Sequence, residues 1–165
     1  MIADQELDKG LLTLKIIWFA MLMSLVIYLF LGFYLGANFG PLMKEDVFGI
    51  LRTLFYVVSF ITLIATWYIR KLFLSGKGQY HQSSQTLQHP ALQRYTTATI
   101  VALALSESIG IYGLVLFFLG KNHMDLYLLI VMSAFAMFTY RPRRDEVISL
   151  AQDGQEDSST GRAMS

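Results

Sequence analysis

Four long apolar segments constrain this chain more than any other feature of its sequence. A helix that crosses about 30 Å of hydrocarbon needs about 20 consecutive, mostly apolar residues. The segments run from Leu11 to Leu35, from Ile50 to Leu72, from Tyr95 to Leu119 and from Met124 to Tyr140. The sequence therefore predicts an all-α integral membrane protein with a four-helix transmembrane domain over residues 11–140.

The fourth segment is the shortest of the four. Its 17 residues extend only about 25 Å at 1.5 Å per residue, so a helix lying in the membrane interface is an alternative to a span. An interfacial helix needs a polar face, and residues 126–132 (Leu-Tyr-Leu-Leu-Ile-Val-Met) offer none. We therefore expect a span here too, in a chain of which 55% of residues are hydrophobic and 15% charged.

The basic residues predict how the helices are oriented. Cytoplasmic segments carry an excess of Lys and Arg, and with four spans the two termini and the central loop share one side. That side carries Lys9, Lys15, Arg70, Lys71, Lys77, Arg94, Arg141, Arg143, Arg144 and Arg162. The other side carries Lys44, Arg52 and Lys121. We therefore expect a multi-pass protein of the cell inner membrane with residues 1–10 and the C-terminus in the cytoplasm.

Two hydrophilic segments accompany the predicted helices. The loop 73–94 is rich in Gln, Ser and Gly, and the segment 141–165 is rich in Ser, Asp and Glu after a basic start. Such compositions bury too little apolar surface to offset the entropy of the chain. We expect a flexible cytoplasmic loop and a disordered cytoplasmic tail. His81 and His89 lie in the loop without cysteines or carboxylates nearby, so no metal site and no cofactor is predicted.

Residue usage also excludes several classes of function. The chain contains no cysteine, which removes disulfides, thiolate catalysis and iron–sulfur clusters. Nucleic-acid binding needs a continuous basic surface, whereas these basic residues cluster at helix ends as orientation signals. The expected partners are the lipid bilayer and either a second copy of the chain or another membrane protein, with no nucleic acid.

Glu107 lies in the middle of the third apolar segment. A carboxylate at the centre of a bilayer costs a few kcal/mol even on lenient insertion scales, so it is rare unless a partner or a function compensates. Burial favours the neutral form of a carboxyl group, and we expect Glu107 to be protonated. Two roles stay open, a structural acid that fixes helix packing and a site that binds protons.

Hydroxyl side chains near the helix centres are expected to surround Glu107. Hydroxyls can hydrogen-bond a carboxyl group across helices, and we predict a supporting polar layer formed by Ser106, Ser108, Ser24, Ser59, Thr62 and Ser133. Small residues at four-residue spacing let helix backbones approach closely. They predict two helix-packing stripes. The first is Gly32, Gly36 and Gly40, continued inward by Ser24 and Tyr28, and the second is Ala98, Ala102, Ser106 and Gly110.

A catalytic site is not predicted. Catalysts usually combine several converging polar groups, whereas the predicted spans carry one acid, scattered hydroxyls and Arg52 near the outer interface. His123 and Asp125 are close to Lys121 in a short connection, where we expect them to be solvated. We therefore expect no catalytic residue and no enzymatic activity.

Four short segments before, at and after Glu107 form a recognisable pattern. They are 89–94 (His-Pro-Ala-Leu-Gln-Arg), 96–100 (Thr-Thr-Ala-Thr-Ile), 104–107 (Ala-Leu-Ser-Glu) and 111–115 (Ile-Tyr-Gly-Leu-Val). Together they resemble the polar loop and second helix of the rotary ATP synthase c subunit, the rotor-ring proteolipid. The resemblance implies that Glu107 matches the ion-binding carboxylate of that family.

The resemblance also implies that Gln88, His89 and Pro90 match the polar loop of the proteolipid. It covers less than a fifth of the chain, and the preceding helix lacks glycine over residues 50–60, where a proteolipid carries a dense glycine pattern. As a whole, the chain looks like small four-span inner-membrane proteins of bacteria with no established activity.

Two functions follow as alternatives. The first is a non-catalytic accessory or assembly component of the membrane, for which Glu107→Gln is silent. The second is a protein that binds or translocates protons through a proteolipid-like carboxyl at Glu107, for which the same substitution abolishes function.

Overall fold

Four helices make up most of the described structure. The computed structural model describes residues 4–36, 40, 42, 45–74 and 90–150. Its helices are α1 (Asp4–Gly36), α2 (Glu45–Leu74), α3 (Pro90–Gly120) and α4 (His123–Thr139). Each predicted segment lies within one helix, except that Tyr140 follows α4 as its C-terminal cap. Helices are the expected outcome, because an apolar environment requires every backbone polar group to be bonded within the segment.

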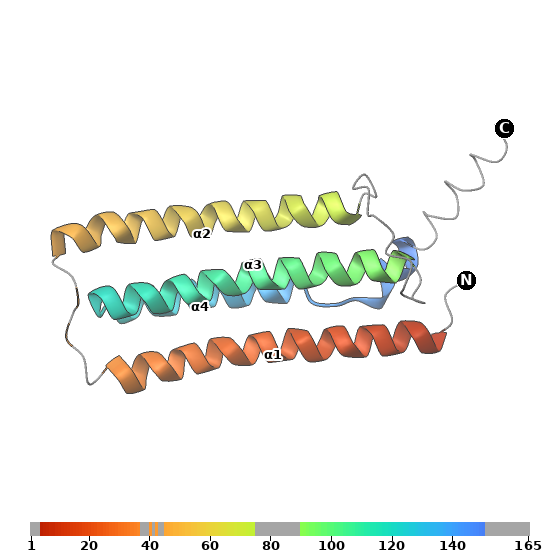
Figure 1. Cartoon of the computed structure of the whole chain (residues 1–165), viewed down its shortest axis with the longest axis horizontal. Coiled ribbons are helices and arrows are strands. Elements are labelled where there is room, and N and C mark those ends of the chain that lie inside the picture. Colours follow the sequence, from red (N-terminus) through yellow and green to blue (C-terminus); the bar gives the residue numbers. More distant parts are fainter. Residues whose placement is uncertain (1–3, 37–39, 41, 43–44, 75–89, 151–165) are drawn as a thin grey trace.

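α3 is the central helix of the bundle. It packs along α1, α2 and α4, and α1 also packs along α4. In Figure 1, α1 and α2 flank α3 on opposite sides, and α4 lies behind α3. The residues that face the most neighbours are therefore those of α3, the helix that carries Glu107.

A tight turn joins α3 to α4. Lys121 has a left-handed backbone (φ 57°), and its N–H donates to the Phe117 carbonyl at 2.8 Å, which ends α3. Asn122 then caps α4, because its side-chain oxygen accepts from the Met124 N–H at 3.0 Å. A capped turn of two residues makes α3 and α4 an antiparallel hairpin.

Three of the helices are long and apolar enough to cross a membrane. The qualifying segments are Leu7–Gly36, Val47–Leu74 and Leu92–Gly120. α4 has 17 residues and reaches the required length only together with Arg144–Leu150, from which it is bent by 52°. The described chain thus has three such helices, or four when this bent pair is counted as one span.

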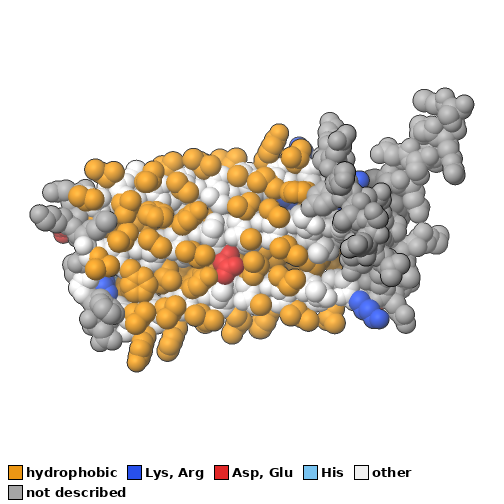
Figure 2. Space-filling model, in the orientation of Figure 1, with side chains coloured by type: hydrophobic (Ala, Val, Ile, Leu, Met, Phe, Trp, Pro, Cys, Tyr) orange, Lys and Arg blue, Asp and Glu red, His pale blue; other side chains and the backbone are white. Residues whose placement is uncertain are grey.

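The outer surface of the bundle is strongly apolar. Figure 2 shows hydrophobic side chains along most of the visible face between the two ends of the molecule. Large exposed side chains occur on the outward faces of α1, α2 and α4, among them Ile16, Phe30, Ile50, Phe60, Ile64, Val131 and Phe135. Exposed apolar area on this scale indicates contact with lipid or with another protein, which fits a membrane protein.

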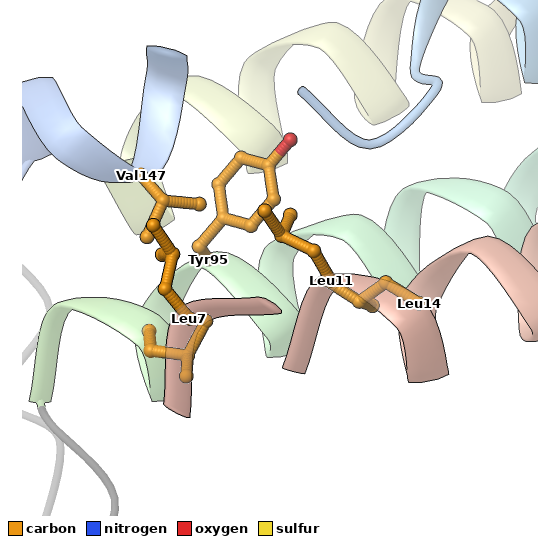
Figure 3. Close-up of a cluster of buried hydrophobic side chains, with 6 residues drawn as sticks. Leu7, Leu11, Leu14, Tyr95 and Val147 are labelled. Atoms are coloured by element: carbon orange, nitrogen blue, oxygen red, sulfur yellow. The ribbon is translucent and has the colours of Figure 1, made fainter. Parts of the chain in front are cut away.

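A cluster of buried side chains joins the N-terminal part of α1 to the C-terminal part of the chain. Its members are Leu7, Leu11, Leu14, Leu92, Tyr95 and Val147, and Figure 3 shows Val147, Tyr95 and Leu7 meeting at this end of the bundle. The Tyr95 hydroxyl accepts from the Arg143 N–H at 2.8 Å. These contacts place the start of α1 and the end of the described chain at the same end of the bundle, as in Figure 1.

The prediction that residues 141–165 are disordered is therefore wrong for its first part. Residues 144–150 form a short helix, because Val147 is completely buried in the cluster and Glu146 pairs with Arg70 of α2. The charged composition of the tail hides the apolar side chains that anchor this helix, Val147 and the partly buried Leu150. Residues 151–165, like most of the predicted loop 73–94, lie outside the described residues.

Candidate functional site

Glu107 projects from the middle of α3 toward α1. Its Oε1 atom accepts a hydrogen bond from the Ser24 hydroxyl at 2.5 Å and another from the Tyr28 hydroxyl at 2.9 Å. Ser24 and Tyr28 are one turn apart on α1, so their side chains reach the same point. The Glu107 side chain is only partly covered by protein, and Figure 2 shows acidic atoms midway along the apolar face.

The Ser24 hydroxyl lies within hydrogen-bond distance of two acceptors. It is 2.7 Å from the Met21 carbonyl as well as 2.5 Å from Glu107 Oε1, and it has one hydrogen to donate. When Glu107 is charged, Ser24 can donate to the carboxylate. When Glu107 carries a proton on Oε1, the acid can donate to Ser24, which then donates to Met21. The same heavy-atom positions therefore accommodate both protonation states.

The other predicted members of the polar layer bond to backbone carbonyls. Ser106 donates to Ala102, Ser108 to Leu105, Ser59 to Phe55, Thr62 to Val58, and Ser133 to the Ser106 carbonyl of α3. Of the predicted layer, Ser24 is the member that bonds Glu107 within the described chain. The reason is geometric. Neighbours of Glu107 in a helix, such as Ser106 and Ser108, point in other directions around α3, and α2 lies on the side of α3 opposite α1 (Figure 1).

Large side chains of the α3–α4 hairpin pack against the small residues of α1. A Cβ atom added to Gly32 would lie 2.5 Å from Leu126 Cδ2, and one added to Gly36 would lie 2.6 Å from Phe117 Cζ. Gly40 is different, since it follows the end of α1 and a Cβ there would meet nothing within 4 Å among the described residues. The prediction that Gly40 extends the helix stripe is therefore wrong.

The small residues of α3 lie at closely packed positions. Ala98 and Ala102 are almost completely buried, and Ala102 packs with Ala136 and Tyr140. A Cβ atom added to Gly110 would lie 2.5 Å from Leu25 Cδ2. Gly110 thus lies against α1 and α4, and Ala102 lies in a cluster with α4 and with Leu63 of α2, as expected for close packing along small residues.

A second polar cluster surrounds Asp125, in the first turn of α4. Asp125 is 0% exposed, and its Oδ1 atom accepts from Arg52 Nε at 2.9 Å and from the Tyr56 hydroxyl at 2.8 Å. Arg52 Nη2 lies 2.7 Å from the same oxygen. Asp125 Oδ2 is buried without a hydrogen-bond partner in the described part of the chain. The cluster therefore joins α2 to α4 by a charge-assisted pair.

The expectation that Asp125 is solvated is wrong. The sequence places Asp125 in a short polar connection, but α4 begins at His123, so Asp125 already faces the interior of the bundle. The sequence does indicate that Arg52 and Tyr56 lie on the same face of α2, because they are one helical turn apart. No sequence feature relates Arg52 and Tyr56 of α2 to Asp125 of α4, so the contact between them could not be predicted.

The described residues contain no group of three or more His, Asp or Glu side chains that could hold a metal ion. His81 and His89 lie outside these residues. Two acids instead form interhelical polar contacts inside the bundle, Glu107 between α1 and α3 and Asp125 between α2 and α4. Both acids can therefore stabilise helix packing, and Glu107 is the one that is partly exposed.

Comparisons of the chain with known protein families, with curated proteins and with solved structures find no match. The resemblance to the rotor-ring proteolipid thus stays a prediction from the residues around Glu107.

Proposed function

We propose that the protein is a non-catalytic accessory or assembly component of the inner membrane, in which Glu107 fastens α1 to the central helix. The observation that carries this proposal is the pair of hydrogen bonds from Ser24 and Tyr28 to one carboxyl oxygen. Interhelical hydrogen bonds between polar side chains hold membrane helices together. The apolar outer faces of α1 and α2 are then available for lipid, a second copy or another membrane protein.

Glu107→Gln is expected to leave the stability of the bundle nearly unchanged, because glutamine keeps a carbonyl oxygen for both hydroxyls. Glu107→Leu removes that acceptor and is expected to lower the free energy of unfolding by about 1 kcal/mol. Ser108→Ala is a matched control, since Ser108 lies beside Glu107 but donates to its own helix. Unfolding in mixed micelles measures the free energy of unfolding of the three variants. A loss of stability for Glu107→Gln as large as that for Glu107→Leu would contradict the packing role.

Proton binding at Glu107 is the second candidate, and a specific observation favours it. Both hydroxyl donors contact Oε1, and Oε2 receives no hydrogen bond from the described residues. The site also accepts either protonation state without movement of heavy atoms. An intramembrane acid with these properties resembles the proton sites of pumps and transporters.

Carbodiimide labelling in native membranes separates the two candidates. A hydrophobic carbodiimide reacts with protonated carboxyl groups, so labelling of an exchanging Glu107 is expected to fall with a definite midpoint as pH rises, as read by mass spectrometry. Glu107→Gln supplies the control for labelling elsewhere. Labelling that is absent or independent of pH would contradict proton exchange and leave the packing role.

We also propose four spans with both termini in the cytoplasm. The basic residues support this orientation, and the absence of native cysteine makes single-cysteine labelling direct. In intact cells a membrane-impermeant maleimide is expected to label Gly40→Cys, whereas Ser149→Cys reacts only after lysis. Labelling of both positions in intact cells would contradict the proposed arrangement, and a reversed pattern would invert it.

A further inference from the structure

A cavity lies between the first turns of α1 and the link that follows α4. Its volume is about 320 Å³, within the range of roughly 300–1,000 Å³ typical of ligand sites. It is open to the outside of the bundle. The side chains around it are Asp8, Leu11, Leu12, Lys15, Pro142 and Arg144.

The walls of this cavity combine apolar and basic surface. Leu11, Leu12 and Pro142 supply the apolar part, and Lys15 and Arg144 supply two cations. Among the described residues that line it, Asp8 is the acid, and its Oδ1 atom lies 3.6 Å from Arg144 Nη1, with the Arg144 side chain 48% and the Asp8 side chain 63% exposed. Exposed pairs of this length contribute little to stability. An anionic ligand can therefore compete with Asp8 for Arg144.

The position of the cavity along α1 corresponds to the edge of a bilayer. Lys15 precedes Ser24 by nine residues and Asp8 precedes it by sixteen, which is about 14 Å and about 24 Å along a helix. With the Ser24–Glu107 contact at the midplane, the hydrocarbon region ends about 15 Å away. The cavity thus spans the hydrocarbon boundary and the headgroup layer.

We propose that this cavity binds the headgroup of an anionic phospholipid. The lipid phosphate lies between Lys15 and Arg144, because guanidinium groups bind phosphate through paired N–H donors and lysine adds a point charge. The acyl chains continue along the exposed apolar face of α1 that begins at Leu12. Basic pockets beside transmembrane helices select anionic lipids in this way. The inference rests on the proposed membrane location.

Native mass spectrometry of the full purified chain tests the proposal. Phosphatidylglycerol and phosphatidylcholine with identical acyl chains are titrated separately, and the anionic lipid is expected to bind at least fivefold more tightly. Lys15→Gln combined with Arg144→Gln is expected to weaken phosphatidylglycerol binding on the order of tenfold, with phosphatidylcholine unchanged. Asp8→Asn is expected to strengthen phosphatidylglycerol binding severalfold, because it removes the negative charge that competes with the phosphate.

Lys9→Gln is the matched control, since Lys9 is exposed on the same helix but does not line the cavity. Equal loss for Lys9→Gln, or no loss for the double variant, would overturn the proposal. Lys15→Gln alone keeps the test valid if Arg144→Gln disturbs the fold. Displacement of the lipid by equimolar inorganic phosphate would assign the cavity to free phosphate instead. Flotation with phosphatidylcholine vesicles checks insertion separately, and failure there would overturn the membrane location itself.

Discussion

Replacing Arg52 with leucine is expected to lower the free energy of unfolding by about 3 kcal/mol, the largest loss among single substitutions at the polar clusters. The substitution leaves Asp125 buried at 0% exposure without its cation. Arg52 itself is 44% exposed, which places the loss at the lower end of the range for buried pairs. Reversible unfolding in mixed micelles measures the change.

A second substitution shows whether the loss comes from the charge. In the Arg52→Leu background, Asp125→Asn removes the uncompensated carboxylate and keeps an oxygen for the Tyr56 hydroxyl, so it is expected to restore most of the stability. Lys71→Leu serves as the control, because it removes a basic residue from the other end of α2. Unchanged stability of Arg52→Leu, or no recovery in the double variant, would show that the ion pair does not hold α2 to α4.

Gly113→Ala is expected to destabilise the bundle by about 1–3 kcal/mol through overpacking. The added Cβ atom would lie 2.9 Å from Leu129 Cβ and 3.4 Å from the Leu126 carbonyl oxygen. Neither atom is the end of a flexible side chain, so α3 and α4 must separate to make room. The same unfolding measurement in micelles reports the loss.

Gly49→Ala is the matched control for this substitution. Gly49 lies on α2, and a Cβ atom there would meet nothing within 4 Å among the described residues. The same chemical change is therefore expected to leave stability within a few tenths of a kcal/mol or to raise it slightly, since alanine favours a helix. Equal effects at Gly113 and Gly49 would contradict close packing between α3 and α4.

The helices could be predicted from the sequence because their signal is local. Long apolar runs such as Leu11 to Leu35 leave a helix as the structure that satisfies the backbone in an apolar environment. The short helix 144–150 could not be predicted, because Val147 and Leu150 order it by packing in a cluster with the distant residues Leu7 and Tyr95. Contacts between segments far apart in the chain produce no periodic pattern in the sequence from which a helix could be predicted.

The site was predictable in part for the same reason. Glu107 is visible in the sequence because it interrupts an apolar run, and Ser24 and Tyr28 share one face of α1. The choice of hydroxyls that reach the carboxyl depends on how α1 is rotated against α3, which the sequence does not contain. Asp125 was missed because the position of the turn at Lys121 decides whether it faces water or the interior.

The central place of α3 has a consequence for how the chain is made. α1 and α2 enter the bilayer first, yet their extensive packing is with α3 and with the helix that follows it. Insertion of membrane helices precedes their association. A nascent chain that ends before Pro90 therefore contains α1 and α2 but lacks α3, the helix against which both of them pack. The native bundle therefore assembles only after α3 (Pro90–Gly120) has left the ribosome.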